Sequence, residues 1–202
     1  VTTMEGQLLQ SIDAEKDPAK KLVLLEDFAK KFPNHEAVTW VLSHIQQHYL
    51  TTKQYDKVLE AGMKSLSVDP TELSAAHNCL KAVEALKDLN LVRLWSTQTW
   101  QLARRNLQLK KPEFGDDNDV AEWKQKLEYA RQVEQYTEYA LYFASLQSKD
   151  PKVKSNFIEL LEQRNPMSEY LAQMRTAHTT VVRQVDIEEA VAAAETQFSK
   201  GE

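Results

Sequence analysis

The sequence predicts an all-α fold of stacked helix pairs, and three observations support this prediction. Only four of the 202 residues are Gly and six are Pro, whereas the helix-forming residues Leu, Ala, Glu, Lys and Gln are common. Every proline falls where a helix is expected to begin or end, because proline suits a first helical turn and breaks a helix interior. In addition, a segment near the N-terminus recurs without a gap near the C-terminus.

The recurring segment sets the organisation of the chain. Lys16 to Glu36, "KDPAKKLVLLEDFAKKFPNHE", aligns with Lys149 to Glu169, "KDPKVKSNFIELLEQRNPMSE", at an offset of 133 residues (149 minus 16). Both copies begin with Lys-Asp-Pro, carry apolar residues at matched places and close with a proline. The offset is close to four units of about 34 residues, so further units are expected between the two copies.

One helix pair is visible between the two copies. Its first helix is expected from about Glu36 to Leu50, and a polar turn follows from Thr51 to Gln54. The second helix is expected from Tyr55 to about Ser67, and the step Asp69-Pro70 closes the unit.

This helix pair resembles a tetratricopeptide repeat, in which two antiparallel helices carry large and small residues at fixed places. Tyr49 stands at the large position late in the first helix, Tyr55 opens the second helix, and Gly62 takes a small site. The pair also departs from the family pattern, because Ile45 and Gln46 stand where Leu-Gly is usual.

The resemblance implies a right-handed superhelical solenoid of about five helix pairs, in a single domain over residues 1–202. A pair of about 35 residues cannot bury its apolar face alone, so each pair is expected to cover its neighbour. The last unit is expected to pair "SEYLAQMRTAHTTVVRQ" with "DIEEAVAAAETQFSK" as two separate helices. The approximate repeats are residues 4–35, 36–70, 71–109, 119–166 and 167–200.

A polar insertion, "KKPEFGDDND" at Lys110 to Asp119, interrupts the repeats and is expected to form a surface loop that caps the next helix. A calcium site is the alternative, since Asp116, Asp117 and Asp119 offer carboxylate oxygens. The loop lacks the spacing and the distal Glu of an EF-hand, which favours the cap.

Several classes of function are disfavoured by the sequence. A net charge of -5 without a basic stripe argues against nucleic-acid binding, and no apolar run is long enough to cross a membrane. No nucleophile elbow, phosphate-binding glycine loop or CxxC motif occurs, so we expect a protein that is not an enzyme and needs no cofactor. We expect it to be soluble, either cytoplasmic or extracytoplasmic after removal of a signal peptide.

The expected function is non-catalytic binding of a protein or peptide partner, as a scaffold or adaptor. In proteins of the family that this chain resembles, the first helix of each pair lines the concave groove. The resemblance therefore places Trp40, His44 and Gln47, which share a helix face through their i, i+4, i+7 spacing, in that groove. Asn78 and Lys81 take analogous places in the third repeat and resemble part of a carboxylate-binding clamp. A competing interpretation packs Trp40 into the core against the first repeat.

Two further interpretations concern histidines and aromatic residues. The pair His44 and His48 could grip a metal ion, which would make the chain a metal-binding protein or a metal-dependent hydrolase. No third ligand is evident, and Ile45 stands where a zincin has Glu, so a structural or partner-facing role is favoured. Most aromatic side chains are expected in the core, including those on one long helix: Tyr129, Tyr136, Tyr139, Tyr142 and Phe143.

Overall fold

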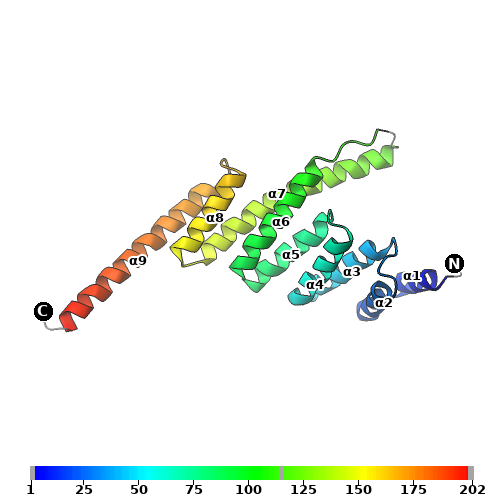
Figure 1. The fold of residues 1–202 in the computed structure, drawn as a ribbon, viewed down its shortest axis with the longest axis horizontal. Coiled ribbons are helices and arrows are strands. Elements are labelled where there is room, and N and C mark those ends of the chain that lie inside the picture. Colours follow the sequence, from blue (N-terminus) through cyan, green and yellow to red (C-terminus); the bar gives the residue numbers. More distant parts are fainter. Residues whose placement is uncertain (1–2, 114–115, 200–202) are drawn as a thin grey trace. The chain divides into compact units, whose positions relative to one another are not determined.

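The computed structural model describes residues 3–113 and 116–199, and 82% of them are helical with no strand among them (Figure 1). The predicted all-α class is confirmed. Phe114 and Gly115 of the predicted insertion, and the end of the last predicted repeat at residue 200, lie outside the described residues. The helices are α1 (Met4–Ala14), α2 (Pro18–Lys31), α3 (Val38–Thr51), α4 (Tyr55–Val68), α5 (Leu73–Leu86), α6 (Leu89–Leu107), α7 (Asp117–Gln147), α8 (Pro151–Arg164) and α9 (Leu171–Ser199).

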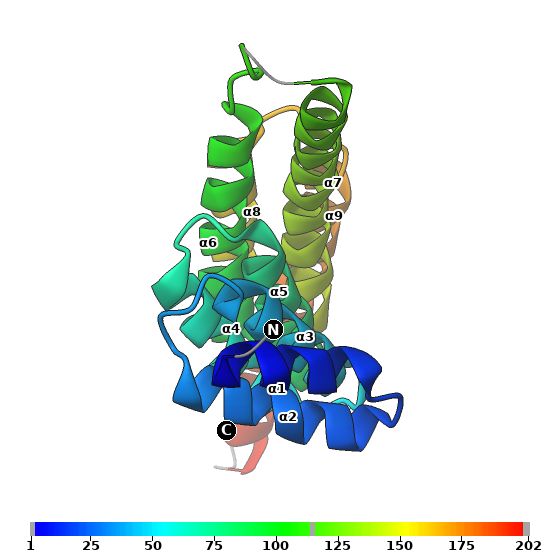
Figure 2. The same ribbon diagram turned by 90° about the vertical axis from the view of Figure 1, so that its right-hand side faces the viewer.

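The chain divides into two compact units, a first unit of Val1–Glu134 and a second unit of Gln135–Glu202. In the first unit each helix from α1 to α5 packs against the next one in the chain, and α3 also contacts α5. Figure 2 shows α1 and α2 side by side at one end of this unit. In the second unit α8 packs against α9. Packing between helices that follow each other in sequence is consistent with a helical repeat.

The two copies of the recurring segment fold into equivalent helices. Helices α2 and α8 are both 14 residues long, both begin with proline, and both are capped by an aspartate. Asp17 Oδ1 accepts from the backbone N–H of Ala19 at 2.9 Å, and Asp150 Oδ1 accepts from that of Lys152 at 2.8 Å. Such caps satisfy backbone donors that a helix start leaves unpaired.

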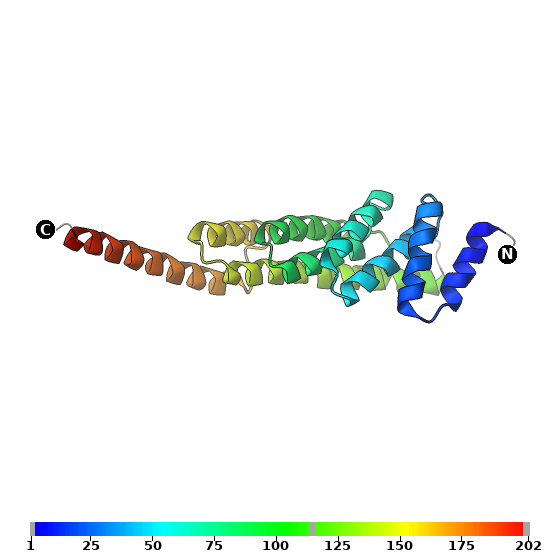
Figure 3. The same cartoon turned by 90° about the horizontal axis from the view of Figure 1, so that it is seen from below.

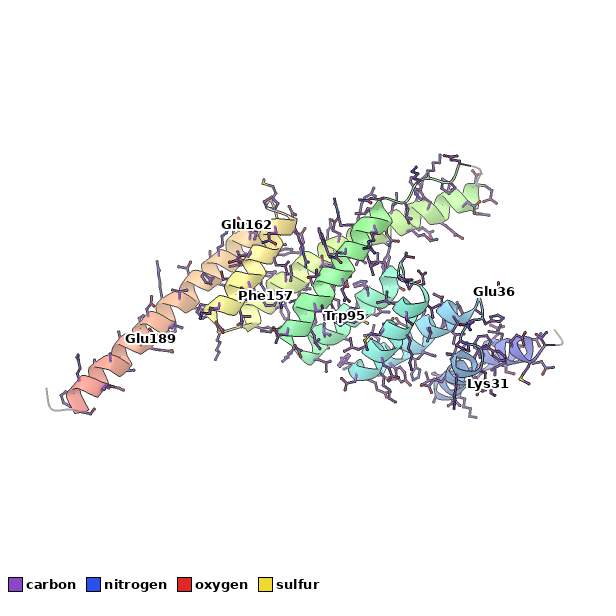
Figure 4. The ribbon with its side chains drawn as sticks, viewed as in Figure 1. Lys31, Glu36, Trp95, Phe157, Glu162 and Glu189 are labelled. Atoms are coloured by element: carbon purple, nitrogen blue, oxygen red, sulfur yellow. The ribbon has the colours of Figure 1, made fainter. Side chains whose placement is uncertain are left out.

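The buried positions of the two copies also coincide. Leu25 and Phe28 of α2 are buried, and so are Ile158 and Leu161, which lie 133 residues further on. Phe157 is buried on α8 as well, and Figure 4 labels it. The same arrangement of caps and buried positions therefore occurs twice in this chain.

The best-defined predicted pair has the expected bounds, because α3 and α4 cover the two predicted helices to within a few residues. A left-handed residue, Lys53 with φ 58°, turns the chain between them. The next pair, α5 and α6, turns in the same way at Lys87, also with φ 58°. Asp88 then caps α6 through the backbone N–H of Leu91 at 3.0 Å.

Gly62 allows the α4 and α5 helices to approach closely. A Cβ atom at this position would overlap Cys79 Sγ and Gln46 Nε2. Gln46 is itself buried, and its Nε2 donates to the carbonyl of Ala75 at 3.0 Å and to that of Val58 at 3.3 Å. The glutamine that departs from the family pattern is thus accommodated by a glycine on the neighbouring helix.

Cys79 belongs to the core, with none of its surface exposed. Burial raises the pKa of its thiol to about 12, so the side chain stays protonated at neutral pH. It behaves as a small apolar residue.

The predicted fifth helix pair is wrong. Residues Leu171–Ser199 form one continuous helix, α9, where two helices and a turn were expected (Figure 3). No Gly or Pro occurs between these ends, and three successive alanines at residues 192–194 favour a helix strongly. Without a residue that breaks the helix, the expected turn near Asp186 does not form.

The insertion loop caps the helix that follows it, as expected. Asp116 Oδ1 accepts from the backbone N–H groups of Asn118 at 2.8 Å and Asp119 at 3.0 Å. The backbone N–H of Asp116 donates in return to Asp119 Oδ2 at 3.0 Å. This reciprocal arrangement is that of a capping box.

The expectation that most aromatic residues lie in the core holds for Trp95, which is buried, but not for the whole of α7. Tyr139 is 40% exposed and Phe143 is 42% exposed. Their rings stack on each other with centroids 5.9 Å apart, and Tyr139 also meets Tyr170 at 6.3 Å. The contact between Tyr139 and Phe143 follows from their i, i+4 spacing, whereas the exposure of both rings and the contact with Tyr170 depend on packing beyond a single helix.

Candidate functional site

Helix α3 presents two opposite faces, and each carries a different candidate surface. Successive residues of an α-helix are turned by about 100°, so residues three and four apart gather on one side. One face consists of Trp40, His44 and Gln47, all exposed, and is called the Trp40 face below. The opposite face carries the buried residues Val38, Leu42, Ile45 and Tyr49.

The Trp40 face holds an aromatic pair in contact with solvent. Trp40 is 45% exposed, and its ring centroid lies 4.2 Å from that of His44. His44 Nδ1 lies 2.9 Å from the carbonyl oxygen of Trp40, which fixes the imidazole beside the indole. Trp40 is therefore not buried in the core of the first unit. The competing interpretation of its role had placed it there.

The two other predicted site residues lie on α5 in different surroundings. Asn78 Nδ2 donates to Gln46 Oε1 at 3.2 Å, so its amide belongs to the polar network around Gly62. Lys81 is half-buried, and this burial lowers the pKa of its amine. The five predicted residues thus fall into two groups, one on α3 and one on α5, with Asn78 already engaged inside the protein.

The opposite side of α3 forms the floor of a cavity of about 670 Å³, which is called the α2–α4 groove below. Its apolar floor consists of the buried α3 residues, and its walls include Ala29 of α2 and Ala61 of α4. This volume falls within the range of about 300–1,000 Å³ that is usual for ligand sites. Charged side chains also line the groove: Glu26, Lys30, Lys57, Glu60 and Lys64.

The acidic groups of the groove already have donors. The hydroxyl of Tyr49 donates to Glu26 Oε1, and burial together with Glu26 raises the pKa of Tyr49 to about 12. Lys64 Nζ lies 2.7 Å from Glu60 Oε1, and this lysine lowers the pKa of Glu60. Lys57 Nζ lies 4.9 Å from the centre of the Tyr49 ring, a cation–π distance.

No pattern in the sequence indicates the α2–α4 groove. Its floor residues follow the spacing of ordinary core positions, and its wall alanines are 32 residues apart (61 minus 29) on helices that do not follow each other directly. Small residues at both walls are the one available signal, and they equally indicate close helix packing. The groove depends on how α2 and α4 diverge above α3, which a linear pattern does not encode.

The metal interpretation gains no further ligand from the structure. The ring of His44 lies against that of Trp40, with centroids 4.2 Å apart, and the rings of His48 and Tyr49 meet edge to face at 6.0 Å. Among residues 3–113 and 116–199, no group of three or more His, Cys, Asp or Glu side chains could hold a metal ion. Of the three loop aspartates that offer carboxylate oxygens for calcium, Asp116 and Asp119 accept from backbone N–H groups.

Comparison with known proteins assigns no family. No protein-family model and no curated protein sequence matches this chain. Within the described part of the chain, no helix has the length and apolar character needed to cross a membrane.

A buried histidine gives the first unit a testable pH dependence. His77 Nδ1 lies 3.0 Å from the Tyr129 hydroxyl, and burial, with Lys81 nearby, lowers the pKa of His77 to about 4. Below pH 6.5 the unfolded chain therefore binds more protons than the folded one, so stability falls as the pH falls towards 4. We expect the free energy of unfolding to drop by about 2 kcal/mol between pH 7.5 and about pH 5.

Urea unfolding followed by tryptophan fluorescence at the two pH values checks this expectation. In the variant His77→Gln, which has no titrating group here, most of the difference should vanish. An equal pH dependence in the parent and the variant would show that other groups cause it.

Proposed function

We propose that this chain is a non-catalytic scaffold or adaptor that binds a protein or peptide, built as a right-handed superhelical solenoid of tetratricopeptide-like helix pairs. In such a solenoid the first helix of each pair lines the concave surface, which would make the Trp40 face part of the binding site. The alternative, a metal-binding protein or hydrolase built on His44 and His48, has no specific observation in its favour.

The observation that carries this proposal is the exposed Trp40 ring on His44. Tryptophan is the residue type most enriched among interface hot spots, because it buries a large area and loses little conformational entropy. The neighbouring imidazole, tilted by 43° to the indole, restricts the indole further before any partner arrives, and such preorganisation lowers the cost of binding. Sequential helix packing in the first unit is consistent with the repeat architecture on which the proposal draws.

The variant Trp40→Ala tests the proposal. Because Trp40 is nearly half exposed, we expect its melting temperature to stay close to that of the parent, whereas a buried Trp would cost about 3–5 kcal/mol. Loss of an interface anchor should weaken binding by about 2 kcal/mol or more. Binding is measured with the intact chain on a random peptide display library, followed by titration of the selected peptides.

A matched control is Val23→Ala on α2, which truncates another exposed apolar residue (64%) away from the Trp40 face. Peptides selected by the parent should bind this control with unchanged affinity. If Trp40→Ala retains full affinity for them, or if the library yields no binder that depends on this face, the proposed site is wrong.

A further inference from the structure

The end of α9, residues 186–199, is an exposed amphipathic helix. All of these residues are exposed, including Ile187 (58%), Val191 (52%) and Phe198 (86%). With Ala194, these residues follow each other at intervals of four, three and four, which places them along one side of the helix. An apolar stripe of this kind is the usual anchor of a helix that lies in a groove.

This α9 end is strongly acidic. It contains four carboxylates, Asp186, Glu188, Glu189 and Glu195, and no Lys, Arg or His. Figure 4 labels Glu189 on this stretch. Glu188 and Glu195 lie seven residues apart, or about 10.5 Å along the axis, on the same flank of the apolar stripe. Two α9 ends paired with each other would bring like charges together. The complementary partner of this end is therefore a surface that is both basic and apolar.

The α2–α4 groove has the complementary features. Its floor is apolar, and three lysines line it, Lys30, Lys57 and Lys64, against two glutamates, Glu26 and Glu60. Lys57 and Lys64, which line the groove, lie seven residues apart on α4 and therefore repeat the spacing of Glu188 and Glu195. The apolar stripe, from Ile187 to Phe198, is about 17 Å long, and the 14 residues of α2 span about 20 Å, so the lengths are compatible.

We propose that the α9 end of one copy of this chain binds in the α2–α4 groove of a second copy, with Glu188 and Glu195 facing Lys57 and Lys64. The contact uses two different surfaces, so it is head-to-tail and can continue from copy to copy. It covers a single helix, which places it among the small and weak interfaces. The Trp40 face lies on the opposite side of α3 and stays free for a separate partner.

Sedimentation equilibrium of the full chain, from micromolar to millimolar concentration, measures the association. The parent should show an average mass that rises with concentration beyond that of a dimer, and high salt should reduce it because it screens the ion pairs. The charge-reversed groove variant K57E/K64E and the charge-reversed helix variant E188K/E195K should each associate at least about tenfold more weakly. Val191→Asp, which places a charge in the exposed apolar stripe, should do the same.

Mixing the two charge-reversed variants is the decisive step. Each groove then meets a helix end of opposite charge, so association should return to the strength of the parent although each variant alone associates only weakly. The control K20E/K31E makes the same change in charge on α2 and likewise removes an exposed ion pair, Lys31 with Asp27 at 2.7 Å. Neither of its lysines lines the groove, so this control should associate like the parent.

Three results would overturn the proposal. A parent that stays monomeric at millimolar concentration has no such contact. Association that survives K57E/K64E but not Val191→Asp indicates pairing between α9 ends instead of binding in the groove. Failure of the mixture to associate, with both variants folded by circular dichroism, shows that these charges do not meet. Trp40→Ala should leave all of these measurements unchanged, which separates this contact from the proposed peptide site.

Discussion

Replacing Phe28 with Ala should lower the free energy of unfolding of the first unit by about 3–5 kcal/mol. Phe28 has no exposed surface, and its ring meets those of Phe32 and His35 at centroid distances of 5.2 and 5.3 Å. Removing the ring leaves a cavity where α2 packs against α3, and close-packed helices relax only partly around such a loss.

Tryptophan fluorescence is a suitable probe for Phe28→Ala in urea, because all four tryptophans belong to the first unit. The control is Phe28→Leu, since the equivalent position of the second copy is Leu161 and is also fully buried. This smaller change should cost only about 1 kcal/mol. If both variants were equally stable, the ring of Phe28 would not be part of a close-packed core.

Replacing Gly62 with Ala should lower the free energy of unfolding of the first unit by about 3 kcal/mol or more. An added methyl group overlaps Cys79 Sγ and Gln46 Nε2, so either α4 moves away from α5 or the glutamine leaves its carbonyl partners. Overpacking alone costs about 1–3 kcal/mol, and unsatisfied buried polar groups add to it. The intrinsic gain from Ala in a helix, about 1 kcal/mol, is smaller than this cost.

The sign of the effect makes Gly62→Ala informative. Gly6→Ala in α1 introduces the same residue at a half-exposed helical position, where we expect a neutral or slightly stabilising effect. Both variants are compared by urea unfolding under the same conditions. If Gly62→Ala had a higher free energy of unfolding than the parent, α4 and α5 would lie further apart than in this structure.

The helix bounds of this chain were largely predictable, because residues close to each helix end determine where the helix begins or stops. The starts of α2 and α8 follow from Asp-Pro steps, which supply a cap and a first-turn residue within two positions. The failure at α9 has the same origin, since the prediction there relied on analogy with other repeats and no local residue ends the helix. In each of these three cases, the local residues determine whether the helix starts or continues.

The candidate surfaces were predictable only in part. The i, i+4, i+7 spacing correctly put Trp40, His44 and Gln47 on one face, because that relation lies within a single helix. The engagement of Asn78 with Gln46, and the groove above α3, depend on how separate helices meet. The spacing of residues along the sequence carries little information on contacts between separate helices. The groove was therefore not predicted.

The equivalence of α2 and α8 bears on how the two copies have diverged. The groove residues Ala29 and Leu42 correspond, 133 positions further on, to Glu162 and Arg175. Glu162 of the second copy forms an ion pair with Arg175, just beyond that copy, with Arg175 Nη2 2.6 Å from Glu162 Oε1, whereas the corresponding residues Ala29 and Leu42 are both apolar. If the copies arose by duplication, evolution could alter this pair of positions without disturbing the shared caps and buried residues. Each copy could thus acquire a surface of its own while inheriting the same fold.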